Sequence, residues 1–242
     1  MRIATVVLGC AGIATFAQAL AEDIAVPAIS SLKPAAAFPA HFRVITIPKT
    51  THNSMALVQD QGQTVLKVDS NDSTGSLAMP VSLDPAAMPR LTWRWKVSRA
   101  LDKADTETKA GDDYAARLYV FFDVPLDSLP FFERTKIRLA RLVAGQDVPT
   151  AALCYVWDNR HRIGYAHMSP YTQRAYMIVM QSGPEHVGQW ITEARDVVAD
   201  FRQAFGHAPP RIIGVAMGND TDNTHEKVTT WFGDVSFGAA SH

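Results

Sequence analysis

The chain has 242 residues and a formal net charge of −1, with 47% hydrophobic, 19% charged and 9% aromatic residues. This hydrophobic content at almost no net charge excludes a mainly disordered chain and is enough for one sizeable core. The charge balance also excludes nucleic acid as the main partner, because phosphate binding needs a clear excess of basic residues.

The N-terminus has the pattern of a secretory signal peptide. Arg2 is the only charged residue before Glu22, and the segment between them is predominantly apolar or small. The sequence Ala19-Leu20-Ala21 fits the small-x-small cleavage rule, so residues 1–21 are predicted to be removed. An uncleaved membrane anchor and lipidation at Cys10 are the alternatives. We therefore expect a periplasmic or secreted protein whose mature form contains one cysteine and no intramolecular disulfide.

Residues 22–40 are predicted to be an extended lead-in, because they contain three prolines among alanines and serines. Residues 41–242 then read as a single β domain, in which turn residues separate short runs rich in β-branched and aromatic side chains. These runs span 42–47, 55–59, 63–69, 76–83, 91–97, 113–122, 152–157, 175–181, 190–199, 211–217 and 229–237. About ten strands with little helix predict an all-β fold, a two-sheet antiparallel β-sandwich of the jelly-roll type.

Two segments have a helical pattern. In residues 127–144 an apolar side and a basic side are spaced as on an amphipathic helix, which predicts a helix inserted between two strands. The apolar side carries Phe132, Leu139 and Val143, and the basic side carries Arg134, Arg138 and Arg141. The basic side is suited to peripheral contact with a membrane or an anionic glycan, and the alternative is an ordinary solvated face. A second, short helix is expected around residues 199–205, before Gly206.

The run from 113 to 122 alternates between core and outer positions. The even positions, predicted to face the core, are Tyr114, Ala116, Leu118, Val120 and Phe122. The odd positions, predicted to face outward, include Asp113, Arg117, Tyr119 and Phe121. An arginine beside aromatic rings resembles a sugar-binding surface, because rings pack on the apolar face of a pyranose while charged groups bind its hydroxyl groups. The alternative is that Arg117 pairs with a carboxylate, Asp220 or Asp222, and stabilises the sandwich.

Two further strands carry large aromatic side chains. Trp93 and Trp95 share a face and are predicted to be core residues. Tyr155 and Trp157 share the face opposite Cys154. If the small side chains of that strand form the core, Tyr155 and Trp157 join the outward-facing surface. The predicted ligand-binding residues are then Asp113, Arg117, Tyr119, Tyr155 and Trp157.

The segment 218–224 is predicted to be a loop that offers hard oxygen ligands. Its residues Asp220, Asp222 and Asn223 suit Ca²⁺, although the segment lacks the glycine and the distal glutamate of an EF-hand loop. The favoured alternative is a network in which these side chains cap backbone amides. No other cofactor is predicted.

Several motifs occur together in one order along the chain. They are Trp93-x-Trp95, Gly111-Asp112-Asp113-Tyr114-Ala115-Ala116-Arg117, Tyr155-x-Trp157, Trp190-x-x-Glu193-x-Arg195-Asp196-Val197, Asp200-Phe201-Arg202, Phe205-Gly206 and Asp220-Thr221-Asp222-Asn223-Thr224. In this order they resemble the exported bacterial family known as domain of unknown function 3047. The resemblance implies an exported single-domain protein and no established activity. The organisation also resembles galactose-binding-like jelly rolls and carbohydrate-binding modules, which implies a sheet face that binds glycan.

Three functions fit these patterns. The first is a non-catalytic periplasmic binding module for a glycan or another polar ligand of the cell envelope. The second is an enzyme that acts on polysaccharide, with Asp112, Asp113 or Glu193 as acid or base, because glycoside hydrolysis needs a pair of carboxylates. The third is an envelope-interaction protein whose helix at residues 127–144 lies at the membrane surface.

Overall fold

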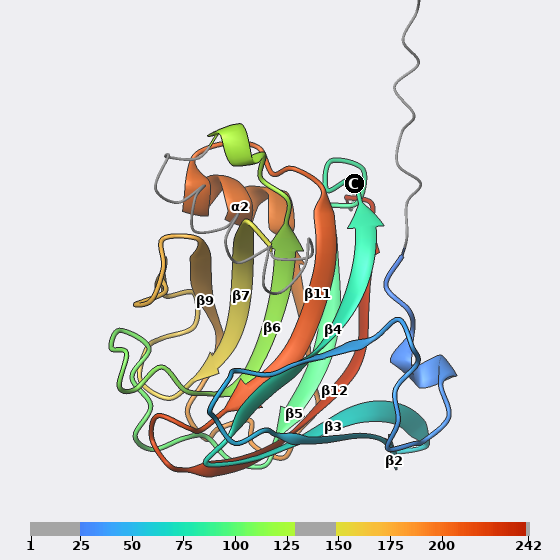
Figure 1. Ribbon diagram of the computed structural model, residues 1–242, viewed down its shortest axis with the longest axis vertical. Coiled ribbons are helices and arrows are strands. Elements are labelled where there is room, and N and C mark those ends of the chain that lie inside the picture. Colours follow the sequence, from blue (N-terminus) through green and yellow to red (C-terminus); the bar gives the residue numbers. More distant parts are fainter. Residues whose placement is uncertain (1–24, 129–148, 241–242) are drawn as a thin grey trace, which may run out of the picture.

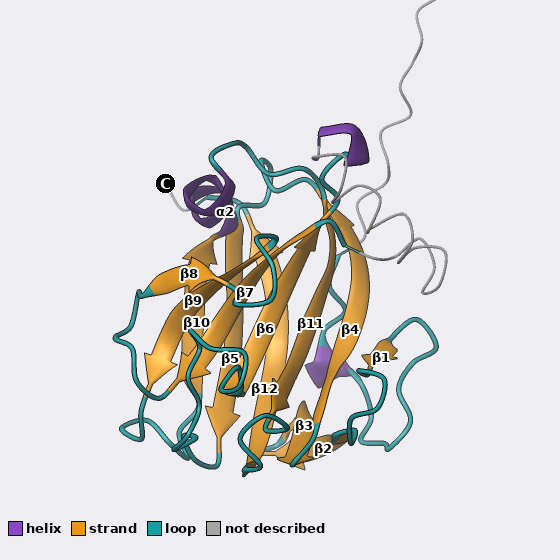
Figure 2. Ribbon diagram, turned by 60° about the vertical axis from the view of Figure 1, so that its left-hand side comes forward, coloured by secondary structure: helices purple, strands orange, loops and turns teal. Residues whose placement is uncertain are grey.

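The computed structural model describes residues 25–128 and 149–240. These residues form a two-sheet jelly-roll β-sandwich, as the strand pattern predicts (Figures 1 and 2). The predicted signal peptide at residues 1–21 and nearly all of the predicted helix at 127–144 lie outside the described residues. No helix in the described ranges is both long enough and apolar enough to cross a membrane.

The larger sheet has seven strands, with β1 at one edge and β8 at the other (Figure 2). In spatial order they are β1 (Arg43–Ile45), β4 (Thr74–Leu83), β11 (Ile212–Asp220), β6 (Tyr114–Phe122), β7 (Ala151–Asp158), β9 (Ala175–Ser182) and β8 (Ala166–Met168). Neighbours in this sheet pair antiparallel, except that β7 and β9 run parallel. The short strand β8 has no counterpart among the predicted strands.

The smaller sheet has five strands, all paired antiparallel. In spatial order they are β10 (Ile191–Asp196), β5 (Arg90–Val97), β12 (Lys227–Gly238), β3 (Gln63–Asn71) and β2 (Ser54–Asp60). The tryptophans of β5 turn inward, where Trp93 is 2% exposed and Trp95 is fully buried. From the larger sheet, Leu118, Val120 and Phe122 of β6 are also fully buried. These core predictions are confirmed.

The helix α2 (Val197–Phe205) lies across one end of the larger sheet (Figure 1). It begins where the Asp196 carboxylate accepts hydrogen bonds from the backbone N–H groups of Val198 and Ala199. It ends at Gly206, whose φ of 77° is in the left-handed region that favours glycine. The helix therefore begins earlier than predicted, and the predicted strand at 190–199 ends at Asp196.

The lead-in is docked on the sandwich rather than extended away from it. Its short 3₁₀ helix η1 (Ile29–Ser31) places the Ile29 side chain, which is fully buried, in the core between the sheets. The backbone N–H of Ser30 donates a hydrogen bond of 2.8 Å to Asp234 of β12. A second 3₁₀ helix, η2 (Leu126–Ser128), follows β6.

Candidate functional site

The turn after β11 is held by the carboxylate of Asp113, the residue just before β6. Strand β11 continues to Asp220, so the connection to β12 begins at Thr221 and is shorter than the predicted loop. Asp113 accepts hydrogen bonds from the backbone N–H and the hydroxyl of Thr224, both at 2.7 Å, and from the backbone N–H of Asn223 at 3.3 Å. Backbone amides of the turn are therefore capped, but by Asp113 and not by the side chains of Asp220, Asp222 and Asn223 as predicted.

Arg117 forms a buried ion pair with Asp220. Arg117 is 9% exposed, and its guanidinium donates a hydrogen bond to the Asp220 carboxylate. The other oxygen of Asp220 accepts a hydrogen bond of 3.0 Å from the backbone N–H of Tyr114. The guanidinium carbon lies 5.1 Å from the ring centre of Tyr114 and 5.5 Å from that of Tyr119. Arg117 is thus the structural ion-pair partner that the alternative interpretation describes.

Burial dominates the electrostatics of this region. It raises the pKa of the Asp220 carboxyl, and the Arg117 guanidinium opposes that rise. Burial also raises the pKa values of Asp112 and Asp222. Asp112 accepts a hydrogen bond of 2.9 Å from the Tyr114 hydroxyl. Burial therefore disfavours the charged form of the carboxyl groups of Asp112, Asp220 and Asp222.

The carboxylates that lie close enough together to share a metal ion are not the ligand set that the sequence predicts. One carboxylate oxygen from each of Asp113, Asp220 and Asp222 lies within 4.8 Å of the others. Asn223, which was predicted as a ligand, instead donates its side-chain N–H to Asp113 at 3.2 Å. Hard oxygens suit Ca²⁺, but the oxygens of Asp113 and Asp220 already accept hydrogen bonds from protein donors. In this structure the carboxylates of Asp113 and Asp220 therefore serve hydrogen bonds within the protein.

The predicted placement of Tyr155 and Trp157 on the outer surface is wrong. In the register of β6 and β7, Tyr155 lies opposite Leu118 and Trp157 opposite Ala116, so both point into the core. They are 0% and 1% exposed, and pack against Trp93 and Trp95 at ring-centre distances of 5.0 and 6.1 Å. The Tyr155 hydroxyl donates a hydrogen bond of 2.8 Å to Asp200 of α2.

Arg117 and Tyr119 do share the outer face of the larger sheet, and Phe121 continues their row along β6. The rings of Tyr119 and Phe121 are nearly parallel, at 16°, with centres 5.6 Å apart. Both side chains are half-buried. We call Tyr119 and Phe121 the aromatic row. Phe121 was on the predicted face, but it was not among the predicted binding residues.

Small residues lie beside the aromatic row on the neighbouring strand. Ala216 of β11 is the register partner of Tyr119, and Gly214 is the partner of Phe121. A Cβ atom on Gly214 would lie 3.4 Å from the Phe121 ring, so the ring leans over this glycine. The positions on β11 beside the two rings therefore carry only small residues.

The acidic residues of the enzyme hypothesis do not converge. Asp112 and Asp113 belong to the cluster at the start of β6, in the larger sheet. Glu193 is on β10 of the smaller sheet, where its carboxylate accepts a hydrogen bond of 2.8 Å from the Gln181 amide. Burial raises the pKa of Glu193. These carboxylates do not form a pair that spans one cleft.

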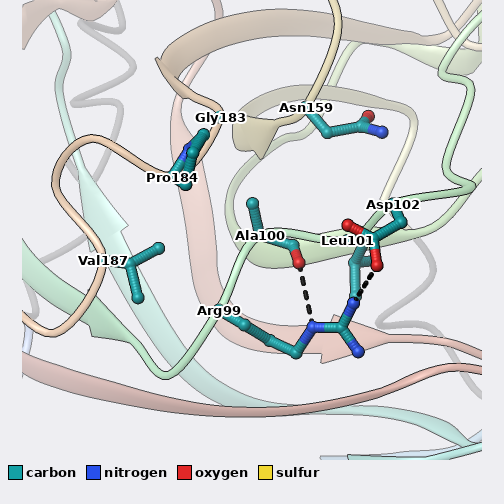
Figure 3. A pocket seen from close by; sticks show the side chains of 8 residues that line it. All are labelled: Arg99, Ala100, Leu101, Asp102, Asn159, Gly183, Pro184 and Val187. Carbon is teal, nitrogen blue, oxygen red and sulfur yellow. Dashed lines mark hydrogen bonds and ion pairs between the residues drawn. The ribbon is translucent and has the colours of Figure 1, made fainter.

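A cavity of about 360 Å³ opens between loops at the end of the sandwich away from α2. Figure 3 shows Arg99 on one side of it and Asn159 on the other, with Pro184 and Val187 along a third wall. The Arg99 guanidinium is already paired with Asp102 and, at 3.1 Å, with Glu226. None of the predicted site residues lines this cavity.

Comparison with solved structures finds jelly-roll proteins at very low identity. A metagenome-derived glycoside hydrolase family 12 endoglucanase is 11% identical, with a TM-score of 0.47 over 86% of this chain and 95% of that chain. A family 11 carbohydrate-binding module from Clostridium thermocellum, in complex with a mixed-linked tetrasaccharide, is 8% identical, with a TM-score of 0.41 over 91% and 98%. These values do not carry a function over to this chain.

The comparison of sequences identifies the family. No curated protein matches the chain. The model of one family matches residues 40–236, which include Asp113, Arg117, the turn after β11 and all the described strands except the last two residues of β12. The chain therefore belongs to the family described as protein of unknown function (DUF3047).

Proposed function

We propose that the protein is a non-catalytic binding module for a glycan or another polar ligand of the cell envelope, exported by a signal peptide at residues 1–21. The observation that carries the proposal is the aromatic row on the outer face of the larger sheet. Two nearly parallel rings, partly open to solvent, offer apolar surface to a ring-shaped ligand.

The surroundings of the row suit such a ligand. Ala216 and Gly214, the register partners of the two rings on β11, are buried and place no bulky side chain beside them. Arg117 has an indirect role in this proposal, because its guanidinium is engaged by Asp220 and packs 5.5 Å from the Tyr119 ring. We expect it to position Tyr119 rather than to bind the ligand.

Binding without catalysis is favoured by the state of the carboxylates. A glycosidase needs an acid and a second carboxylate on opposite sides of the scissile bond. Asp113 and Asp220, the carboxylates near the row, accept hydrogen bonds from the protein itself. Glu193 lies on the other sheet. Polysaccharide cleavage by this set is therefore the weaker candidate.

A glycan array probed with residues 22–242 tests the proposal, followed by calorimetry with a neutral oligosaccharide that binds. Tyr119→Ala and Phe121→Ala should each weaken binding at least about 5-fold, because stacking on an aromatic side chain contributes about 1–3 kcal/mol for nucleic-acid bases. Ile163→Ala, which removes a loop side chain that is 58% exposed, is the control and should leave affinity unchanged. Equal effects of all three variants, or no array signal, would contradict the proposal. N-terminal sequencing of exported protein should read from Glu22.

A further inference from the structure

The outer face of the smaller sheet carries a second group of aromatic and charged side chains, which the proposed function does not use. The Lys96 ammonium of β5 lies 5.2 Å from the ring centre of Trp190 and 4.6 Å from that of Trp231. Arg94 is two residues along the same strand. All four side chains are half-buried. We call Arg94, Lys96, Trp190 and Trp231 the Trp–cation patch.

The charge of Lys96 is balanced within the protein. Its ammonium contacts the Asp60 carboxylate at 2.8 Å, and the same oxygen accepts a hydrogen bond of 2.6 Å from the indole N–H of Trp190. The Lys96 hydrogen bond holds the pKa of Asp60 below its ordinary value. The Asp60 carboxylate therefore binds both Lys96 and the indole of Trp190, and so holds Trp190 in position.

Arg94 has no carboxylate as an ion-pair partner of its own within the described residues. Its guanidinium carbon lies 4.4 Å from the ring centre of Trp190, and one nitrogen donates a hydrogen bond to the neutral amide of Gln63. No ion pair to a carboxylate involves Arg94 in the described part of the chain, although its charge also acts on the Asp60 carboxylate that Lys96 contacts. A guanidinium has five N–H donors, so most of those of Arg94 are available to another acceptor.

The Arg94 side chain lies over a glycine of the neighbouring strand β12. A Cβ atom at Gly233 of β12 would lie 2.4 Å from Arg94 Nε and 2.6 Å from its Cγ. Gly233 has no left-handed φ, so space for Arg94, and not backbone conformation, is what excludes a side chain there. The arginine therefore lies flat against the sheet, stacked under Trp190.

We propose that the Trp–cation patch binds a sugar that carries a carboxylate, such as a uronic acid. A carboxylate accepts paired hydrogen bonds from a guanidinium, and it would balance the charge of Arg94. Trp231 presents a partly open aromatic face next to it, which suits the apolar side of a sugar ring. The patch is on the opposite side of the sandwich from the aromatic row, so this site is independent of the proposed function.

Calorimetry of residues 22–242 with trigalacturonate and with triglucuronate tests the site, and the methyl esters of both are uncharged controls. We expect binding of at least one acid, no binding of its ester, and a loss of affinity as salt is raised. Arg94→Gln should weaken binding at least about 10-fold, because a hydrogen bond between charged groups is worth that much or more. Lys67→Gln, which removes a lysine paired with Asp69 on the same face, should change it less than about twofold.

Two further variants separate the site from a merely structural contact. Gly233→Ala keeps every charge but forces Arg94 to move, so it should also weaken binding while the thermal melt shows a folded protein. Phe121→Ala, in the aromatic row, should have no effect on the acidic sugar. Equal binding of acid and ester, retained binding in Arg94→Gln, or no binding of either acid at millimolar concentration would overturn the proposal.

Discussion

Replacing Arg117 by alanine should strongly destabilise the fold. The side chain is 9% exposed, and its removal leaves the Asp220 carboxylate, itself 3% exposed, without its charge partner. Breaking a buried ion pair in this way costs about 3–5 kcal/mol. In a chain of this size that loss corresponds to a fall in melting temperature of about 6–20 °C. Urea denaturation followed by tryptophan fluorescence measures the change in the free energy of unfolding directly.

The double variant Arg117→Ala with Asp220→Asn identifies the cause. It removes both charges, so it should recover a substantial part of the lost stability. Lys67→Ala breaks an exposed pair, in which the lysine and Asp69 side chains are 35% and 40% exposed, and should cost at most about 1 kcal/mol. A cost below about 1 kcal/mol for Arg117→Ala, equal to that control, would refute the assignment of Arg117 as a structural ion-pair partner.

Three other predictions concern the N-cap of α2, the turn after β11 and the buried carboxyl group of Asp112. Asp196→Ala removes the N-cap of α2 and should cost about 1 kcal/mol in denaturation, and no change would show that the cap is dispensable. Added Ca²⁺ should not raise the melting temperature, since capping accounts for the turn after β11, and a rise that Asp222→Ala abolishes would contradict this. Because burial raises the pKa of Asp112, its contribution to stability is complete below about pH 4 and is lost as the pH rises through the folded-state pKa. Asp112→Asn should therefore remove part of the decline in stability above pH 4, and an unchanged pH profile would contradict the assignment.

The fold could be predicted because several strands have one buried face and one partly exposed face. In β5 the burial of Trp93 and Trp95 alternates with the partial exposure of Arg94 and Lys96, which is the pattern the sequence shows. The residues Leu118 to Phe122 of β6 behave in the same way. At the start of β6 the alternation fails, because Tyr114 packs beside Cys154 and Val156 on the outer side of the larger sheet.

The face of β7 could not be predicted from alternation. All eight of its residues are buried, so both faces of the strand are apolar and neither is marked as the core. Tyr155 and Trp157 fill the wide space between the sheets, and Cys154 and Val156 take the outer side. The signal that could have decided this is size, since the inward tryptophans of β5 need large aromatic partners.

Contacts between segments that are distant in the sequence also could not be predicted from the pattern of residues. The pairing of Arg117 with Asp220 was anticipated as an alternative, but the role of Asp113 depends on the start of β6 meeting the turn after β11. That meeting is set by strand order, which no local pattern reveals. The patch formed by Trp190 and Trp231 likewise joins residues on different elements.

The aromatic row is tested most directly by NMR of protein with labelled alanine methyl groups, titrated with the neutral oligosaccharide that binds best on the array. Ala216 is the register partner of Tyr119, and Ala78 is the next alanine across the larger sheet. Ala194 is on β10 of the smaller sheet. Binding at the aromatic row should shift the Ala216 and Ala78 methyl signals and leave Ala194 unchanged. A shift of Ala194 alone, with Ala216 and Ala78 unmoved, would contradict the proposed site.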